Sequence, residues 1–134
     1  MKEIQINVDG AVVRLLLAEG AVCLYNSASL EDFLRKNSFD NALQLATWIR
    51  ESYQEYFSKP LNVSEDSIAV EILGHVYFED FMERLGNKIP LNIMDKICEK
   101  ISEHCNEINV GEKEHDHNRE FWDLVTPVVK KYYN

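Results

Sequence analysis

The sequence predicts an α+β domain in which an N-terminal three-stranded antiparallel meander packs on a bundle of four to five helices. Two observations lead to this prediction. Apolar and polar residues alternate in the first part of the chain, as in strands that have one buried face. From residue 29 onward, apolar residues recur every three or four positions, as in amphipathic helices. A chain of 134 residues has the length of one domain, so we expect residues 1–134 to form a single unit, with the meander at 2–25 and the helical part at 29–133.

The meander is predicted from three apolar segments and the turn signals between them. Apolar residues alternate with polar ones in residues 2–8, and Asp9-Gly10 then matches a type I′ turn, whose central residues both need positive φ. Residues 11–17 form a second and more apolar segment, which predicts a strand covered on both faces. After the next turn signal, residues 21–25 form the third strand. A sheet of this size is barely stable alone, so we expect it to lie against the helices.

Two helices are expected before residue 60. Ser29 begins a Ser-x-x-Asp sequence that resembles a capping box, and the short helix that follows should end near Asn37. Ser38 or Asp40 can cap the next helix, which runs to about Ser58 before a Lys-Pro pair ends it. The apolar face of this second helix would consist of Ala42, Leu45, Ala46, Ile49, Tyr53, Tyr56 and Phe57.

Residues 64–86 are the most apolar long segment and predict the central helix of the bundle. Apolar side chains would cover most of its circumference, so neighbouring elements must cover it on several sides. Ser64 or Asp66 can cap its start, and Gly86 can supply the left-handed residue that ends it.

Two further helices are expected in the last third of the chain. After a turn at Ile89-Pro90, we expect a fourth helix from Leu91 to Ile108 and then a polar loop at residues 111–118. The last helix should run from Arg119 to Tyr133, with Pro127 bending or breaking it. The apolar face of the fourth helix would consist of Leu91, Met94, Ile97, Cys98, Ile101, Cys105 and Ile108, and that of the last helix of Phe121, Leu124, Val125, Val128 and Tyr132.

The composition restricts the classes of partner. The chain has 14 basic and 23 acidic side chains and a formal net charge of -9, whereas nucleic acid and anionic membranes attract clustered Lys and Arg. We therefore expect neither as a partner, and a basic protein suits this charge better. The three cysteines have no paired spacing, and no apolar run reaches the ~18 residues of a membrane span. We expect no signal peptide, because the first residues have the alternating pattern of a strand. These features predict a cytoplasmic protein, because disulfide frameworks belong to oxidising compartments.

Glu71, His75 and Glu79 form the pattern that most suggests chemistry. Positions i, i+4 and i+8 lie in one column of a helix, so three potential metal ligands would share a face. His115 and His117 in the polar loop could complete a divalent metal site. The alternative is that these residues form only the solvent-facing side of a mostly buried helix. We favour this alternative and expect no cofactor, because no metalloenzyme signature such as H-E-x-x-H is present.

Trp48 is the candidate for partner binding. On a helical wheel it lies about 120° from the middle of the apolar face, among Gln44, Glu51 and Glu55. Tryptophan is enriched among the residues that dominate binding energy at interfaces. The alternative is that Trp48 packs under the meander or against the first helix. The tyrosine pair near the C-terminus raises the same question.

These features favour a small acidic cytosolic domain that binds another protein, such as an antitoxin or immunity protein that inhibits a basic partner. The analogy rests on size and charge. Catalysis is the weaker expectation, because no Gly-rich phosphate loop, G-x-S-x-G or C-x-x-C sequence is present. Two alternatives stay open. One is a metal-dependent enzyme that uses Glu71, His75 and Glu79, and the other is a non-catalytic structural homodimer.

Overall fold

The computed structural model describes residues 2–8, 11–25, 28–86, 88–95, 107–111 and 119–133. Several predictions from the sequence fall outside these ranges. They are the turn at Asp9-Gly10, most of the fourth helix and the polar loop from residue 112 to residue 118. The loop histidines His115 and His117 and the cysteines Cys98 and Cys105 therefore also lie outside the described residues.

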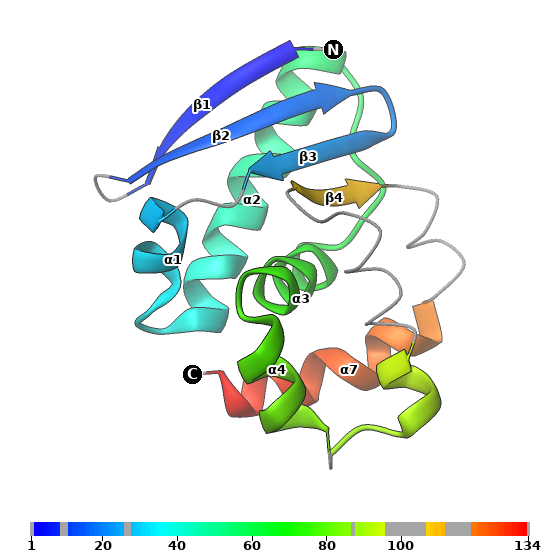
Figure 1. Cartoon of the computed structure of the whole chain (residues 1–134). Coiled ribbons are helices and arrows are strands. Elements are labelled where there is room, and N and C mark those ends of the chain that lie inside the picture. The colour runs from blue at the N-terminus through cyan, green and yellow to red at the C-terminus, as the bar shows by residue number, and fades with distance from the viewer. Residues whose placement is uncertain are drawn as a thin grey trace.

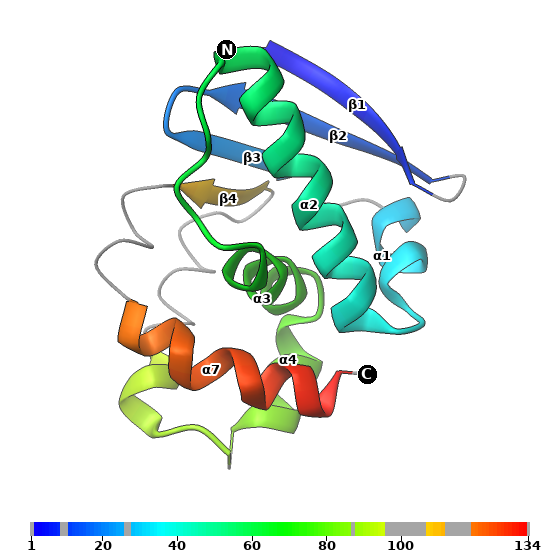
Figure 2. The ribbon, with the colours of Figure 1, turned by 180° about the vertical axis from the view of Figure 1, so that it is seen from behind.

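An antiparallel sheet lies on one side of the molecule and the helices lie on the other, which confirms the α+β prediction (Figures 1 and 2). The sheet has the order β1 (Lys2–Val8), β2 (Ala11–Ala18), β3 (Ala21–Tyr25) and β4 (Glu107–Gly111). The first three strands are the predicted meander. None of the helices in the described part of the chain is long and apolar enough to cross a membrane.

β4 is the element of the sheet that the sequence analysis missed. It pairs antiparallel with β3, and Ile108, which was expected on the apolar face of the fourth helix, lies opposite Leu24. The residues Glu107 to Gly111 read EINVG, in which two β-branched side chains alternate with polar ones. The helical spacing of apolar residues before this segment led us to extend the predicted fourth helix as far as Ile108, which lies in β4. The open edge of β3 offers hydrogen bonds that make a strand the better conformation for this segment.

The helices cover only one face of the sheet among the described elements. The inward side chains Val13, Leu15 and Leu17 of β2 are buried, and so are Val22 and Leu24 of β3. Their neighbours in sequence point to the other face: Val12 is 44% exposed and Leu16 is half-buried. The prediction that the second strand is covered on both faces is therefore wrong, because α1 and α2 lie on the same side of it (Figure 1).

α1 (Ala28–Leu34) and α2 (Ser38–Phe57) agree with the predicted short and long helices. The predicted inward side chains Leu30, Phe33 and Leu34 of α1 are buried. Tyr53 of α2 is also buried, and its hydroxyl accepts a hydrogen bond of 2.7 Å from the backbone N–H of Gly20, which ties the helix to the β2–β3 turn. Tyr56 was expected in the core but is 47% exposed.

The N-terminus of α2 is capped by tertiary contacts, not by Ser38 or Asp40 as expected. The preceding residue Asn37 has φ 49° and makes no capping hydrogen bond with its side chain. The backbone N–H of Phe39 instead donates to the carbonyl oxygen of Tyr133 at 3.2 Å, from the opposite end of the chain. The side-chain amide of Asn41 donates to the carbonyl oxygens of Phe33 in the last turn of α1 (2.7 Å) and of Lys36 in the connection to α2 (2.6 Å).

The predicted central helix consists of two helices, α3 (Glu65–Val76) and α4 (Phe78–Leu85). They meet at Tyr77, which has φ -117° and ψ 45° and whose hydroxyl donates to the carbonyl oxygen of Glu31 at 2.7 Å. The backbone ladder continues on both sides of the break, because Tyr77 N–H donates to Leu73 and Phe81 N–H donates to Tyr77. The break therefore sacrifices few backbone hydrogen bonds and lets Tyr77 reach α1.

Only the N-terminal end of this segment agrees with the prediction. Ser64 caps α3, as expected, by accepting a hydrogen bond of 3.1 Å from the N–H of Ser67. Gly86 does not end α4 in the left-handed region, since its φ is -54°. α3 is nevertheless central: every residue from Ser67 to Gly74 is buried except Glu71, which is half-buried.

The last helix, α7 (Arg119–Tyr132), buries a face that differs in part from the predicted apolar face. Its buried side chains include Trp122 and Val129, whereas Leu124, expected inside, is 45% exposed. Pro127 does not break the helix. Pro127 has no N–H to donate to the carbonyl oxygen of Asp123, one turn earlier in the helix. Both residues lie on the exposed side of α7. Water can replace that donor, so the proline is tolerated. Before α7, residues 91–95 are helical as expected, but Leu91 is 76% exposed.

The position of α3 leads to a stability prediction. Leu73→Ala should reduce the free energy of unfolding by ~2–5 kcal/mol, because the cavity cannot be filled by a helix that is packed on several sides. Urea denaturation of both proteins measures the difference. Leu91→Ala is the matched control and should cost less than about 0.5 kcal/mol, because its side chain is exposed. A cost below about 1 kcal/mol for Leu73→Ala would contradict the central role of α3.

Candidate functional site

The outer side of α2 carries the predicted partner-binding residues. Gln44, Glu51 and Glu55 are exposed, and Trp48 is half-buried and packs against the edge of the core. In Figure 2 this helix lies in front of the sheet, and none of the other described helices or strands lies in front of it. Trp48 is therefore part of both a packing contact and the surface. We call these four residues the Trp48 face.

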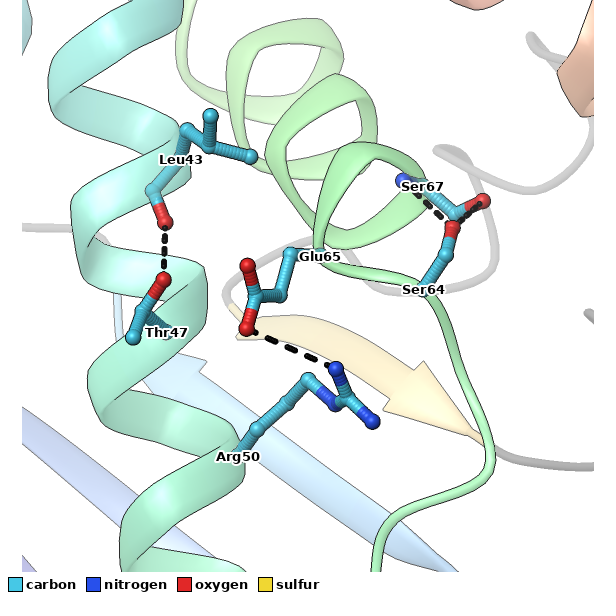
Figure 3. Close-up of polar contacts among 6 residues, drawn as sticks. All are labelled: Leu43, Thr47, Arg50, Ser64, Glu65 and Ser67. Atoms are coloured by element: carbon cyan, nitrogen blue, oxygen red, sulfur yellow. Dashed lines mark hydrogen bonds and ion pairs between the residues drawn. The ribbon is translucent and has the colours of Figure 1, made fainter.

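The Trp48 face is acidic because the positive charge of α2 is on another side of the helix. Arg50 is the only basic residue of α2, and it reaches Glu65 in the first turn of α3 with an N–O distance of 3.4 Å (Figure 3). Thr47 donates its hydroxyl to the carbonyl oxygen of Leu43 within the helix at 3.1 Å (Figure 3). The exposed carboxylates Glu51 and Glu55 therefore have no cation from α2 beside Trp48.

The predicted metal-ligand column is divided between two helices. Glu71 and His75 lie on α3, whereas Glu79 lies on α4 beyond the break at Tyr77. His75 and Glu79 still line one shallow, open hollow of about 600 Å³, together with Glu83. Within the described residues, no group of three or more His, Cys, Asp or Glu side chains could hold a metal ion. His115 and His117 lie outside that part of the chain.

A second hollow, of about 370 Å³, lies where the chain's C-terminal end meets the α1–α2 connection and α4. We call it the C-terminal hollow. The sequence did not predict this hollow, because its residues come from three separate segments. The adjacent basic and aromatic pairs at residues 130–133 were the available signal. The hollow is lined by Arg35, Asn37, Ser38, Tyr77, Asp80, Arg84, Tyr132 and Tyr133.

Arg84 connects two of the segments that line the C-terminal hollow, α4 and the end of α7. Its Nε donates to Oδ1 of Asp80 at 2.9 Å, and its Nη1 donates to the carbonyl oxygen of Tyr132 at 3.2 Å. Its guanidinium carbon also lies 5.4 Å from the centroid of the Tyr133 ring. One side chain of α4 thus contacts a backbone oxygen and an aromatic ring at the end of α7, which fixes the guanidinium in place.

Tyr133 is the most buried polar side chain of the C-terminal hollow. It is 5% exposed, and its ring packs against Phe81 with 5.8 Å between the centroids. Its hydroxyl lies beside the Asp80 carboxylate, which can accept its hydrogen. Burial raises the pKa of Tyr133, and the nearby Asp80 carboxylate raises that pKa further because it opposes a second negative charge.

The raised pKa of Tyr133 predicts a loss of stability in alkali. Folding holds this proton more tightly than the unfolded chain, where tyrosine titrates near pH ~10. The free energy of unfolding should therefore fall as pH rises above that value. Tyr133→Phe should reduce the loss, although Tyr77, whose pKa burial also raises, keeps part of it. Urea unfolding between about pH 8 and about pH 11 measures the slope. Tyr56→Phe, at an exposed site, should retain the wild-type slope, and an equally steep loss in Tyr133→Phe would contradict the prediction.

A second prediction concerns metal. We expect calorimetric titration of the protein with zinc or manganese to show no site of micromolar or better affinity, because a helix break divides the column of ligands. A single tight site that is lost in His75→Ala would instead support the metal-dependent enzyme. Glu3→Ala, which removes a carboxylate on β1, is the control for nonspecific effects of charge.

Comparisons with known proteins give no family and no function for this chain. No protein-family model matches it, and neither a curated protein nor a solved structure matches it.

Proposed function

We propose that this protein is a small acidic cytoplasmic domain that binds a basic partner protein through the Trp48 face of α2. A role as an inhibitor, such as an antitoxin or immunity protein, suits this mode of binding. The observation that carries the proposal is a half-buried tryptophan that shares one face of α2 with two exposed carboxylates, a face that no other described helix or strand covers in Figure 2. The net charge of -9 favours a partner of the opposite sign.

The packing of Trp48 suits an interface anchor. Because the side chain already contacts the edge of the core, it has less rotational freedom to lose when a partner binds. The remaining exposed part of the ring can still be buried by the partner. Large aromatic side chains that become fully desolvated in this way dominate the energy of many interfaces. The rigid 20-residue helix beneath it keeps the contact surface in a defined shape.

The carboxylates of the face have a different role from that of the tryptophan. Glu51 and Glu55 are exposed, so their interaction with a partner acts mainly before contact, while the two molecules approach. Salt screens such attraction over a distance of about 8–10 Å near physiological ionic strength. The two kinds of residue can therefore be distinguished by kinetics.

Trp48→Ala should increase the dissociation rate of the complex, at a cost of ~2 kcal/mol or more in binding free energy. The partner is first isolated by affinity capture on the wild-type protein, and the rates are then measured by surface plasmon resonance. Tyr56→Ala removes an exposed aromatic ring from the same helix and should leave dissociation unchanged. Thermal melting of each variant checks folding. An unchanged dissociation rate in well-folded Trp48→Ala would exclude the Trp48 face.

Glu51→Lys combined with Glu55→Lys should slow association and make it less dependent on salt. Asp95→Lys combined with Asp123→Lys gives the same change in net charge at exposed sites on other helices. This control pair should slow association less, because steering depends on where the charges lie. Equal effects of the two pairs would indicate that only net charge matters.

A further inference from the structure

We propose that two copies of this chain associate through the open edge of β1, so that their two sheets join into one. The edge is thus occupied by the same strand of a second copy, which runs antiparallel to the first. Three observations support this proposal: the edge lacks the features that prevent pairing, two core side chains are half-buried beside it, and the strand is complementary to itself. The association uses no residue of the Trp48 face and does not depend on the proposed function.

β1 is an outermost strand of the sheet in the described part of the chain. One side of it pairs with β2 along its whole length, from Lys2 opposite Leu17 to Val8 opposite Ala11. No described strand pairs with its other side (Figure 1). In an antiparallel pair, alternate residues bond to the neighbouring strand, and the N–H and C=O groups of the others point away from it. The outer edge of β1 can therefore accept one more strand.

The open edge lacks the usual features that prevent edge strands from pairing, which are proline, bulges and charge along the strand. β1 contains no proline, and its register with β2 advances one residue at a time, so it contains no bulge. Its two charged side chains both contact side chains of their own chain. Nε of Arg14 donates to Oε1 of Glu3 at 2.9 Å, and the ammonium of Lys2 lies 5.9 Å from the centroid of the Tyr56 ring. Residues 4–8 are uncharged, so they do not repel an approaching strand.

Ile4 and Ile6 leave apolar surface open beside this edge. They lie opposite Leu15 and Val13, which are buried on the side of the sheet that the helices cover. Both isoleucines pack against the core but are only half-buried, because β1 has a neighbouring strand on one side alone. A strand added at the edge would place its own inward side chains beside them. Burial of this apolar surface would favour the association.

A second copy of β1 suits the edge because the strand is complementary to itself. When two copies run antiparallel about a two-fold axis at Gln5, residues 2–8 of both strands are paired throughout. Ile4 then lies opposite Ile6 of the second copy on the inward face. On the outward face, Glu3 lies opposite Asn7 of the second copy, whose amide can donate to the carboxylate. No two like charges meet in this arrangement.

The other antiparallel registers are less favourable. Inward side chains stay opposite inward side chains only when the axis passes through a residue. An axis at Ile4 pairs only residues 2–6, and an axis at Ile6 pairs only residues 4–8. An axis at Glu3 sets two carboxylates opposite each other, which is destabilising. The axis at Gln5 is therefore preferred, and the assembly closes as a dimer because both copies use the same edge.

The charge and size of the interface make the dimer reversible. Each copy has a formal net charge of -9, so the two copies repel each other at long range. A single pair of strands also buries less surface than an obligate dimer, which buries about 2,000 Å² or more. We therefore expect association that depends on concentration and tightens when salt screens the repulsion. Binding of a basic partner to the Trp48 face should respond to salt in the opposite direction.

The test is analytical ultracentrifugation of the full chain over a range of concentrations. The wild-type chain should pass from monomer to dimer as its concentration rises. Gln5→Lys sets two ammonium groups opposite each other at the axis and should raise the dissociation constant of the dimer about fivefold or more. Asn7→Lys is the matched control with the same change in charge. It lies opposite Glu3 of the second copy, so it should not weaken the dimer.

A charge exchange at the axis tests the same register. Gln5→Glu should also weaken self-association, because it sets two carboxylates opposite each other. An equal mixture of the Gln5→Lys and Gln5→Glu chains should recover dimerisation as a mixed dimer. Isotope labelling of one variant lets native mass spectrometry identify that dimer. Gln5 is exposed, so both variants should fold, and thermal melting checks this.

Four results would overturn the proposal. A chain that stays monomeric at every concentration would leave the edge to a strand of another protein. A dimer that Gln5→Lys does not weaken would use a different surface. Equal weakening by Gln5→Lys and Asn7→Lys would indicate an effect of charge in general. Assemblies larger than a dimer would indicate open pairing of β1 with β4 instead of the closed two-fold arrangement.

Discussion

The need to cover α3 on every side governs the rest of this structure. Its buried residues, from Ser67 to Gly74, span more than two helical turns and leave only one half-buried acidic side chain among them. α2 and β4 contact α3, and α4 and α7 contact it as well. These neighbours come from all parts of the chain, so the sheet, the long helix and the C-terminal helix must assemble before the apolar surface of α3 leaves water. The same requirement explains β4, which extends the sheet over α3.

The C-terminal end of the chain closes the fold by polar contacts. The carbonyl oxygen of Tyr133 accepts a hydrogen bond from the first turn of α2, and Arg84 of α4 donates to the carbonyl oxygen of Tyr132. Tyr77, at the break between α3 and α4, reaches across to the carbonyl oxygen of Glu31 in α1. Three helix ends thus depend on donors and acceptors from distant segments. The C-terminal hollow lies among these contacts, so its geometry is determined by the same interactions that close the fold.

The middle and the N-terminus of α2 differ in their charged neighbours. Its middle carries Glu51 and Glu55 beside Trp48, whereas its N-terminus faces the cations around the C-terminal hollow. The Trp48 face is acidic, whereas the C-terminal hollow combines Arg35 and Arg84 with the Asp80 carboxylate. Because the two surfaces use different residues, substitutions in one test it without removing the other.

The sequence by itself determined the elements whose signals are local: the meander, the approximate extents of α1 and α2, and a cap at the start of α3. It left open whether Trp48 packs in the core or lies at the surface, and in the structure this side chain is half-buried. Alternation, capping residues and helical periodicity act within a few positions, so they can be recognised in one segment. Only the tertiary structure decided β4, the break at Tyr77, the buried face of α7 and the C-terminal hollow. Each of these depends on a partner far away in the chain, such as the open edge of β3 or the carbonyl of Glu31. Local propensity differs little between the alternatives there, so the free energy of long-range packing and hydrogen bonding selects between them.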